Sequence, residues 1–198
     1  MSPSDRLARQ LQFLVEIDKL KSVLRRTWLV DGSRLENDAE HSWHLGLFAV
    51  LLAEHAAGEN LDLLRVLKMV LMHDLVEIDA GDTYAYDEVA KADQADREQQ
   101  AADRLFALLP PDQAAEFRGL WDEFEAGRTL EARFAAAVDR FQPLLHNYLT
   151  RGRAWRQHGV TSDRVVARTR SIADGAPVLW EHVLELIRDA VAEGYLAE

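Results

Sequence analysis

The residues of this sequence that could perform chemistry are histidines and carboxylates, and the first of them are neighbours. His73 and Asp74 follow an apolar run, where an unpaired imidazole and an unpaired carboxylate would both be costly to bury. A divalent cation would compensate them, because both side chains are metal ligands. Glu77 follows His73 by one helical turn, so we expect all three to project into one arc of a helix. The pattern indicates a metal site with a carboxylate beside it.

A His-Asp pair alone is more often a hydrogen-bonded pair than a metal site, so the interpretation depends on its context. His41 lies in the first turn of a predicted helix, where a ligand can point at a neighbouring helix, and Asp139 lies on a helix face of small apolar residues. A buried Asp again requires a partner. The sequence contains no cysteine, so imidazole and carboxylate groups must hold any metal.

The order His41, then His73-Asp74, then Asp139 across successive helices resembles the pattern that gives the HD-domain superfamily its name. The local sequences are more specific. Residues 36–42 (ENDAEHS) and 73–82 (HDLVEIDAGD) resemble the branch that contains bacterial 5′-deoxynucleotidases and human HD-domain-containing protein 2. The similarity covers about residues 10–150. We therefore expect an all-α, single-domain helical bundle of the HD type.

The resemblance implies a role for each matching residue. The metal ligands would be His41, His73, Asp74 and Asp139. No histidine lies between Asp74 and Asp139, so we expect one divalent ion with open positions for water and substrate. Cobalt or manganese is the expected metal for activity, although such a site also accepts Mg, Zn or Fe.

The resemblance also implies which residues meet the substrate. Glu77 matches a carboxylate that activates the attacking water, and Asp82 matches an acidic residue at the substrate edge. An Arg-Trp pair orients the phosphate in the deoxynucleotidases, and Arg26 and Trp28 resemble it with one residue interposed. The segment after Asp82 would border the nucleoside, through Thr83, Tyr84 and Ala85.

These residue types suit phosphomonoester hydrolysis without the resemblance. A divalent ion polarises a phosphoryl oxygen and acidifies a bound water, Glu77 can take the proton, and Arg26 can neutralise the phosphate. The leading hypothesis is hydrolysis of 5′-deoxyribonucleoside monophosphates to deoxyribonucleoside and phosphate. The alternatives are an HD phosphohydrolase for another small phosphate ester and a non-catalytic, metal-stabilised helical binding module.

The composition of the 198-residue chain limits the classes of partner that it can bind. Its net charge of −11 argues against a general nucleic-acid binder, which needs a basic surface. Residues 1–34 are the exception, with seven Lys or Arg against four Asp or Glu, so an anionic substrate could approach there. No apolar run is long enough for a membrane span and the N-terminus is polar, so we expect a cytoplasmic protein with a small nucleotide substrate and no membrane partner.

Apolar spacing predicts helices over about 5–25, 39–57, 61–78, 87–108, 112–126, 130–149, 163–172 and 177–192. We expect one domain, with its core over about 10–150 and C-terminal helices over about 161–194 packed on it. We also expect a homodimer, for which the apolar segment Val178–Ile187 offers a contact surface. His44 is expected to pack and the other tryptophans to anchor the core or an interface. His146 is expected to form hydrogen bonds in the core, and the other histidines, His55, His158 and His182, to lie at the surface. The role of Arg151, Arg153 and Arg156 is left open.

Overall fold

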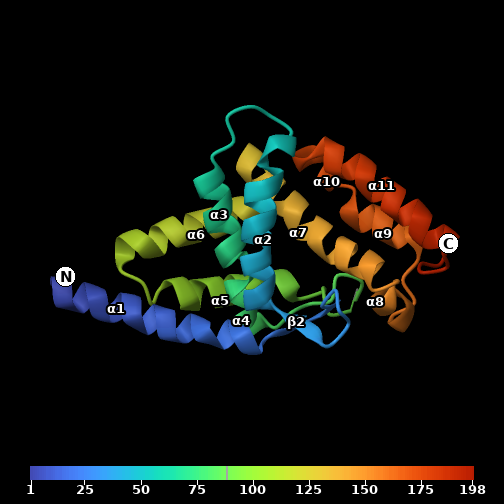
Figure 1. The fold of residues 1–198 in the computed structure, drawn as a ribbon. Coiled ribbons are helices and arrows are strands. Elements are labelled where there is room, and N and C mark those ends of the chain that lie inside the picture. Colours follow the sequence, from blue (N-terminus) through green and yellow to red (C-terminus); the bar gives the residue numbers. More distant parts are fainter. Residues whose placement is uncertain (88) are drawn as a thin grey trace.

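The computed structural model describes residues 1–87 and 89–198 and confirms the all-α class. The longer helices are α1 (Pro3–Glu16), α2 (Asp38–Leu52), α3 (Leu63–Met72), α5 (Gln94–Phe106), α6 (Pro111–Ala126), α7 (Leu130–Leu149), α9 (Ser162–Thr169) and α11 (Pro177–Ala192). Short helices are α4 (Glu77–Ala80), α8 (Arg153–Gln157) and α10 (Ile172–Gly175), and 3₁₀ turns are η1 (Ile17–Ser22), η2 (Ala53–His55) and η3 (His73–Val76). Figure 1 shows how they are arranged.

The first predicted helix is shorter than its apolar spacing indicates. Helix α1 begins at a capping box between Ser2 and Asp5 and ends at Glu16, where η1 tightens the chain. The chain then extends into β1 (Leu24–Trp28), which pairs antiparallel with β2 (Leu35–Asn37). The prediction of helix to residue 25 is wrong because hydrogen bonds to β2, a contact distant in sequence, override the local helical pattern.

The second and third predicted helices hold the chemical residues. Asn37 caps α2 through a capping box with Glu40, which places His41 in the first turn. The predicted helix over 61–78 is not continuous: α3 ends at Met72, and His73 and Asp74 lie in η3 before α4 begins. Gly81 ends α4 with φ of +75°, a conformation that favours glycine. The 3₁₀ turn therefore sets the directions of His73 and Asp74.

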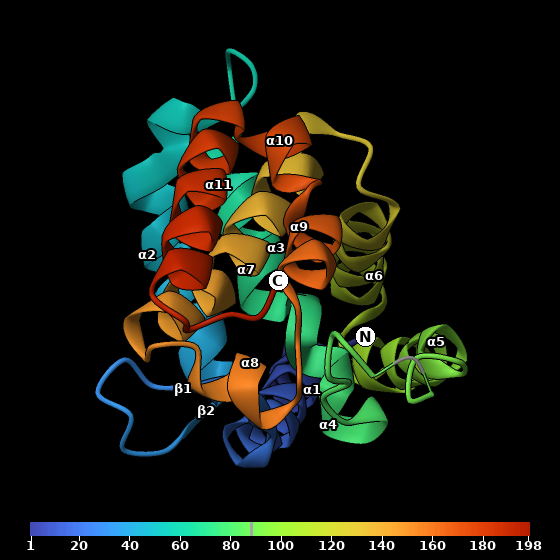
Figure 2. The same ribbon diagram turned by 90° about the vertical axis from the view of Figure 1, so that its right-hand side faces the viewer.

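Helix α7 lies at the centre of the bundle. Thr129 caps it, and ten of its residues are buried. Helices α2, α3, α6, α10 and α11 pack around it, and Figures 1 and 2 show it crossing the middle of the molecule. Gly175 at the end of α10 lies directly against the backbone carbonyl of Arg133 in α7. Asp139 is therefore fixed on the best-supported element of the fold.

Two further boundaries differ from prediction. Helix α5 begins at Gln94 rather than 87, because the Asp87 carboxylate accepts hydrogen bonds from the backbone amides of Val89 and Ala90 and holds a turn. Residue 88, inside that predicted helix, lies outside the described residues. The prolines at 110 and 111 separate α5 from α6 as predicted, with Pro111 at the first helical position.

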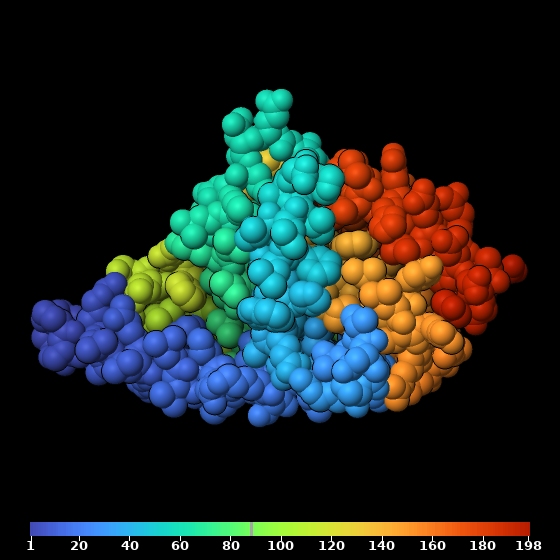
Figure 3. All heavy atoms as spheres, viewed as in Figure 1, coloured from blue at the N-terminus to red at the C-terminus, as the bar shows by residue number. Residues whose placement is uncertain are grey.

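The C-terminal apolar segment faces inward. Leu179, Val183, Leu186 and Ile187 of α11 are buried in the same cluster of core side chains as the residues of α7. Four of the seven apolar side chains of Val178–Ile187 are thus unavailable for an intermolecular contact. Helix α2 lies at the surface of the molecule in the view of Figure 3. Its large exposed apolar side chains are Trp43, Leu47, Val50 and Leu51. None of the helices in the described ranges has the length and apolarity that crossing a bilayer requires.

Candidate active site

Helix α2, turn η3 and helix α7 bring four predicted metal ligands together. Asp139 Oδ1 lies 3.0 Å from His41 Nε2 and 3.5 Å from His73 Nε2. Asp74 Oδ1 lies 3.1 Å from His73 Nε2, and the other carboxylate oxygen of Asp74 lies 3.9 Å from His41 Nε2. Four residues separated by up to 98 positions thus direct their donor atoms at one point.

The histidines of this cluster are prepared to bind a cation. The Nδ1 atom of His73 donates to the carbonyl of Val70 over 3.1 Å, which leaves Nε2 as the ligand atom. That buried Nε2 atom has no hydrogen-bond partner in the described part of the chain. Two imidazole nitrogens surrounded by carboxylate oxygens match the nitrogen and oxygen donors of divalent transition metals, so these residues fit a metal ion.

Protons hold the cluster together without a metal. Burial and the Arg25 charge oppose protonation of His41, but hydrogen bonds to Asp139 and Glu36 raise its pKa to about 9. Burial likewise opposes charge on Asp139, yet the hydrogen bond from His41 and the nearby His73 imidazole lower the pKa of Asp139 well below its ordinary value. A cation entering the cluster therefore displaces a proton that these groups share.

A buried hydrogen-bond network behind His41 fixes the orientation of its ring. His41 Nδ1 donates to Gln142 Oε1 over 3.2 Å and lies 3.4 Å from Glu36 Oε2. Gln142 Nε2 donates to Glu36 Oε1 over 2.7 Å and to His146 Nε2 over 3.2 Å, and His146 Nδ1 donates to the Trp28 carbonyl over 3.2 Å. The network assigns the His41 proton to Nδ1 and links a metal ligand to strand β1.

Arg25 is the strand residue that contacts the cluster, although the sequence analysis selected Arg26. Its Nη1 atom lies 2.7 Å from Asp74 Oδ2 and 3.1 Å from Asp38 Oδ1. Burial opposes its charge, but Asp74 and the surrounding carboxylates raise the pKa of Arg25 well above its ordinary value. Arg25 is thus already neutralised by the protein. Nothing in the spacing distinguished it from its neighbour, because only the pleat of β1 decides which arginine faces the carboxylates.

Glu77 lies in a buried group of carboxylates beside the ligands. Single oxygens of Asp38, Asp74 and Glu77 lie within 4.8 Å of one another. Burial and the charges of Asp74 and Asp38 raise the pKa of Glu77. Burial and Asp74 likewise raise the pKa of Asp38, to about 6. Without a cation these carboxylates therefore hold a proton, whereas a bound divalent ion would favour their charged form, in which Glu77 can accept a proton from an activated water.

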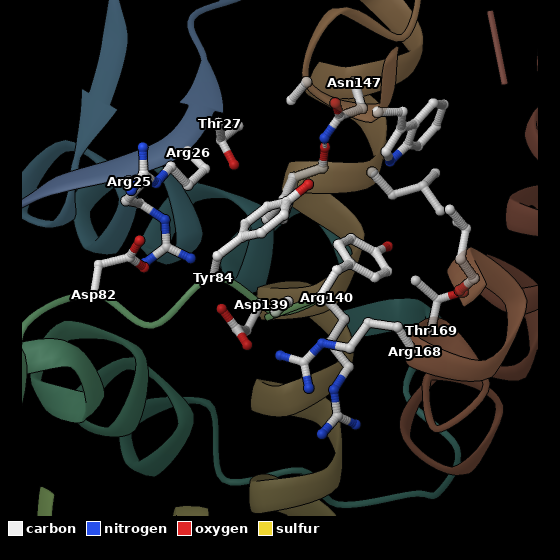
Figure 4. Close-up of a pocket in the computed structure, with 17 residues that line it drawn as sticks. Arg25, Arg26, Thr27, Asp82, Tyr84, Asp139, Arg140, Asn147, Arg168 and Thr169 are labelled. Carbon is white, nitrogen blue, oxygen red and sulfur yellow. Dashed lines mark hydrogen bonds between the residues drawn. The ribbon is translucent and has the colours of Figure 1, made fainter. Parts of the chain in front are cut away.

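A pocket opens next to Asp139 between strand β1, the 82–86 loop and helices α7, α8 and α9, as Figure 4 shows. The predicted residues Arg26, Asp82, Tyr84 and Ala85 line it. Its apolar lining comes from Tyr86, Pro143, Leu144, Trp155 and Val165. Burial raises the pKa of Asp82. The pocket combines an apolar surface suited to a nucleoside with charged groups beside the metal ligands.

Two predicted substrate contacts lie elsewhere. Trp28 is not among the residues that line this pocket, because its indole donates to Gln157 over 3.0 Å and packs under the guanidinium of Arg153, 3.2 Å from the ring centre. Thr83 accepts a hydrogen bond from Arg97 over 3.3 Å and is also absent from the lining. Regular alternation would place Trp28 on the same face of the strand as Arg26, but the pairing of β1 with β2 is irregular between Leu24 and Trp28.

Two residues that line the pocket were not predicted from the sequence. Arg140 of α7 and Arg168 of α9 both line the pocket. The only local signal for Arg140 was that it directly follows the expected ligand Asp139. Arg168 reaches the pocket only because α9 packs on α7, a contact that no local pattern predicts. The expected core hydrogen bonding of His146 agrees with its place in the buried network.

Comparison with known proteins places the chain in a family. The HD domain model matches residues 17–180. The chain belongs to the HD domain family. The bovine protein named 5′-deoxynucleotidase HDDC2 is 31% identical over 144 residues, which cover 72% of this chain and 68% of that protein. The human protein of the same name is 29% identical over 136 residues, or 68% of this chain. The matched part spans 65% of the human protein's length.

Solved structures agree with the HD fold. A chain from Magnetospirillum magnetotacticum MS-1, named a "predicted metal-dependent phosphohydrolase", superimposes with a TM-score of 0.95 at 54% identity. The match covers 100% of this chain and 99% of that one. A conserved hypothetical protein from Pyrococcus furiosus shares the fold with a TM-score of 0.63 at 21% identity, covering 90% and 99% of the two chains.

Proposed function

We propose that this HD-family enzyme is a metal-dependent phosphomonoesterase that hydrolyses 5′-deoxyribonucleoside monophosphates to deoxyribonucleoside and phosphate. The observation that carries the proposal is the convergence of His41, His73, Asp74 and Asp139 beside one pocket with an apolar lining and a free arginine, Arg26. Relatives that bear the name 5′-deoxynucleotidase support the substrate class.

The ligand set would hold one divalent ion, which when bound polarises the phosphoryl oxygens and lowers the pKa of an attacking water. Glu77 lies beside Asp74 and accepts the proton of that water as its oxygen bonds to phosphorus. The bond from phosphorus to the sugar oxygen then breaks, and the departing oxygen takes up a proton. Asp82, whose pKa is raised by burial, lines the pocket and is suited to supply that proton.

Pocket residues would position the remainder of the substrate. Arg26 carries a charge that no carboxylate in the described ranges neutralises by an ion pair, so it is available to the phosphate. Tyr84 and Ala85 lie on the loop that follows Asp82 and would border the nucleoside. The combination favours a small phosphate ester with an apolar, planar group.

The test is phosphate release from a panel of nucleoside monophosphates after chelation, with Mn, Co, Mg, Zn or Fe restored separately. We expect activity on deoxynucleoside monophosphates that Glu77→Gln lowers about 100-fold or more, since general base catalysis contributes about 10²–10⁴-fold. Glu54→Gln, an exposed carboxylate of η2, is the matched control. Bound metal without activity on the panel would favour another phosphate ester or a non-catalytic binding module.

Several finer features belong to the same proposal. Cobalt or manganese is the proposed activating metal, the whole chain is proposed to be one HD domain, and the cytoplasmic location stays a prediction.

A homodimer is also proposed. The exposed apolar face of α2, which includes Trp43 and Leu51, supports it as the contact surface. Sedimentation of Leu51→Glu against the unmodified protein tests that surface: a shift to monomer is expected, and an unchanged dimer contradicts it.

A further inference from the structure

Arg140 and Arg168 are two cations of the pocket that the protein leaves uncompensated. Over residues 1–87 and 89–198, no carboxylate oxygen lies within the 4.0 Å ion-pair distance of either guanidinium, and neither side chain donates a hydrogen bond. The buried Nε atom of Arg140 has no hydrogen-bond partner. Figure 4 shows the two side chains running side by side below Asp139. Such donors are costly to desolvate without an acceptor.

The positive charges of Arg140 and Arg168 also favour binding of an anion. The Arg168 charge acts on Arg140, while the carboxylates of Asp139, Glu125 and Asp174 stay beyond ion-pair distance from it. The fold thus holds two like charges together in a chain whose net charge is −11. An anion placed between them would relieve this repulsion and satisfy several guanidinium N–H groups at once.

The position of Arg140 and Arg168 indicates which anion they would bind. Both arginines line the pocket that contains Arg26 and Tyr84. Both also line an adjoining cavity that contains the expected ligand His73 and the proposed base Glu77. In Figure 4, Arg26 lies on the far side of Asp139 from the pair. A group held by Arg140 and Arg168 therefore lies between the metal ligands and the nucleoside pocket.

We propose that Arg140 and Arg168 form an anion subsite that binds the phosphate group of the substrate from the side opposite Arg26. The assignment of that phosphate to a nucleoside monophosphate rests on the proposed function; the subsite itself requires only a phosphate. Arg25 cannot take this role, because Asp74 and Asp38 already occupy its Nη1 atom. A monoester dianion has three terminal oxygens, so it can accept from the pair and from Arg26 together.

The first experiment measures binding of inorganic phosphate to the manganese-loaded protein by calorimetry. Arg140→Gln and Arg168→Gln are each expected to weaken phosphate binding by about 10- to 100-fold, the loss typical of a hydrogen bond to a charged group. Arg188→Gln removes the same charge from the exposed face of α11, away from the pocket linings, and is expected to leave binding unchanged. Equal binding by unmodified protein and both pocket variants would overturn the subsite.

Two further measurements separate binding from folding and from turnover. Because the pair is repulsive when no anion is bound, Arg140→Gln is expected to keep or raise the unfolding temperature of the phosphate-free protein; a large loss would assign Arg140 a structural role instead. Guanidinium ion added to Arg140→Ala is expected to restore phosphate binding, and failure to do so counts against the subsite. If the unmodified enzyme hydrolyses no nucleoside monophosphate while the variants lose phosphate binding, the subsite stands and the proposed function fails.

Discussion

Gln142 gives the sharpest test of how the fold prepares the metal ligands. Its side chain is fully buried in α7 and contacts His41, Glu36 and His146 at 2.7–3.2 Å. Gln142→Leu keeps nearly the same volume but removes these three hydrogen bonds and a longer one, of 3.4 Å, to His44 Nδ1. It leaves the His41 Nδ1–H group and one Glu36 oxygen buried without these partners.

The expected loss of stability follows from those contacts. The bond to His146 is neutral and contributes about 1 kcal/mol, while the bonds to the Glu36 carboxylate and to the protonated His41 contribute about 1.5–3 kcal/mol each. The free energy of unfolding should therefore fall by about 4–7 kcal/mol, a large part of the 5–15 kcal/mol typical of a folded domain. The ring of His41 also loses its orienting acceptor, so metal affinity should fall by about 10- to 100-fold.

The assay is urea unfolding with and without saturating manganese, combined with calorimetric titration of the metal at a temperature where the variant is folded. A 10- to 100-fold weaker affinity removes about 1.4–2.7 kcal/mol of the stabilisation that bound metal provides. Gln113→Leu is the control, because Gln113 accepts a hydrogen bond from Gln10 on the far side of the bundle. A change in unfolding free energy below 0.5 kcal/mol, or a stability loss with unaltered metal affinity, would refute the reasoning.

Other measurements test neighbouring parts of the argument. Because the pKa of His41 is raised to about 9, protonated His41 stabilises the metal-free protein fully below about pH 6.5, and this stabilisation is lost as the pH rises through 9. Manganese affinity should therefore increase about tenfold per pH unit between pH 7 and 9. An affinity that does not change with pH would contradict the displacement of a shared proton. Gly175→Ala should cost about 1–3 kcal/mol in unfolding free energy, because its new methyl would lie 2.1 Å from the Arg133 carbonyl oxygen. Gly119→Ala, in an open position of α6, should gain about 0.5–1 kcal/mol; equal effects of the two changes in chemical denaturation would show that the close contact carries no strain.

The sequence by itself determined the helical class and most helix positions. Residues 130–149 were predicted as one helix and form α7 with the same bounds, because a threonine cap and a periodic apolar face are local signals. It also predicted which histidines and carboxylates lie together, since such side chains are costly to bury without a common partner. His41, His73, Asp74 and Asp139 converge as the spacing of HD proteins implies.

Only the tertiary structure decided which charges are free to act. Arg25 and Arg26 are adjacent and chemically identical, yet Arg25 pairs with Asp74 while Arg26 lines the pocket. Arg168 joins Arg140 from a helix that begins more than twenty residues later, and no local pattern relates them. Whether an arginine is neutralised depends on carboxylates that reach it from other elements, so availability for a phosphate is a property of packing rather than of spacing.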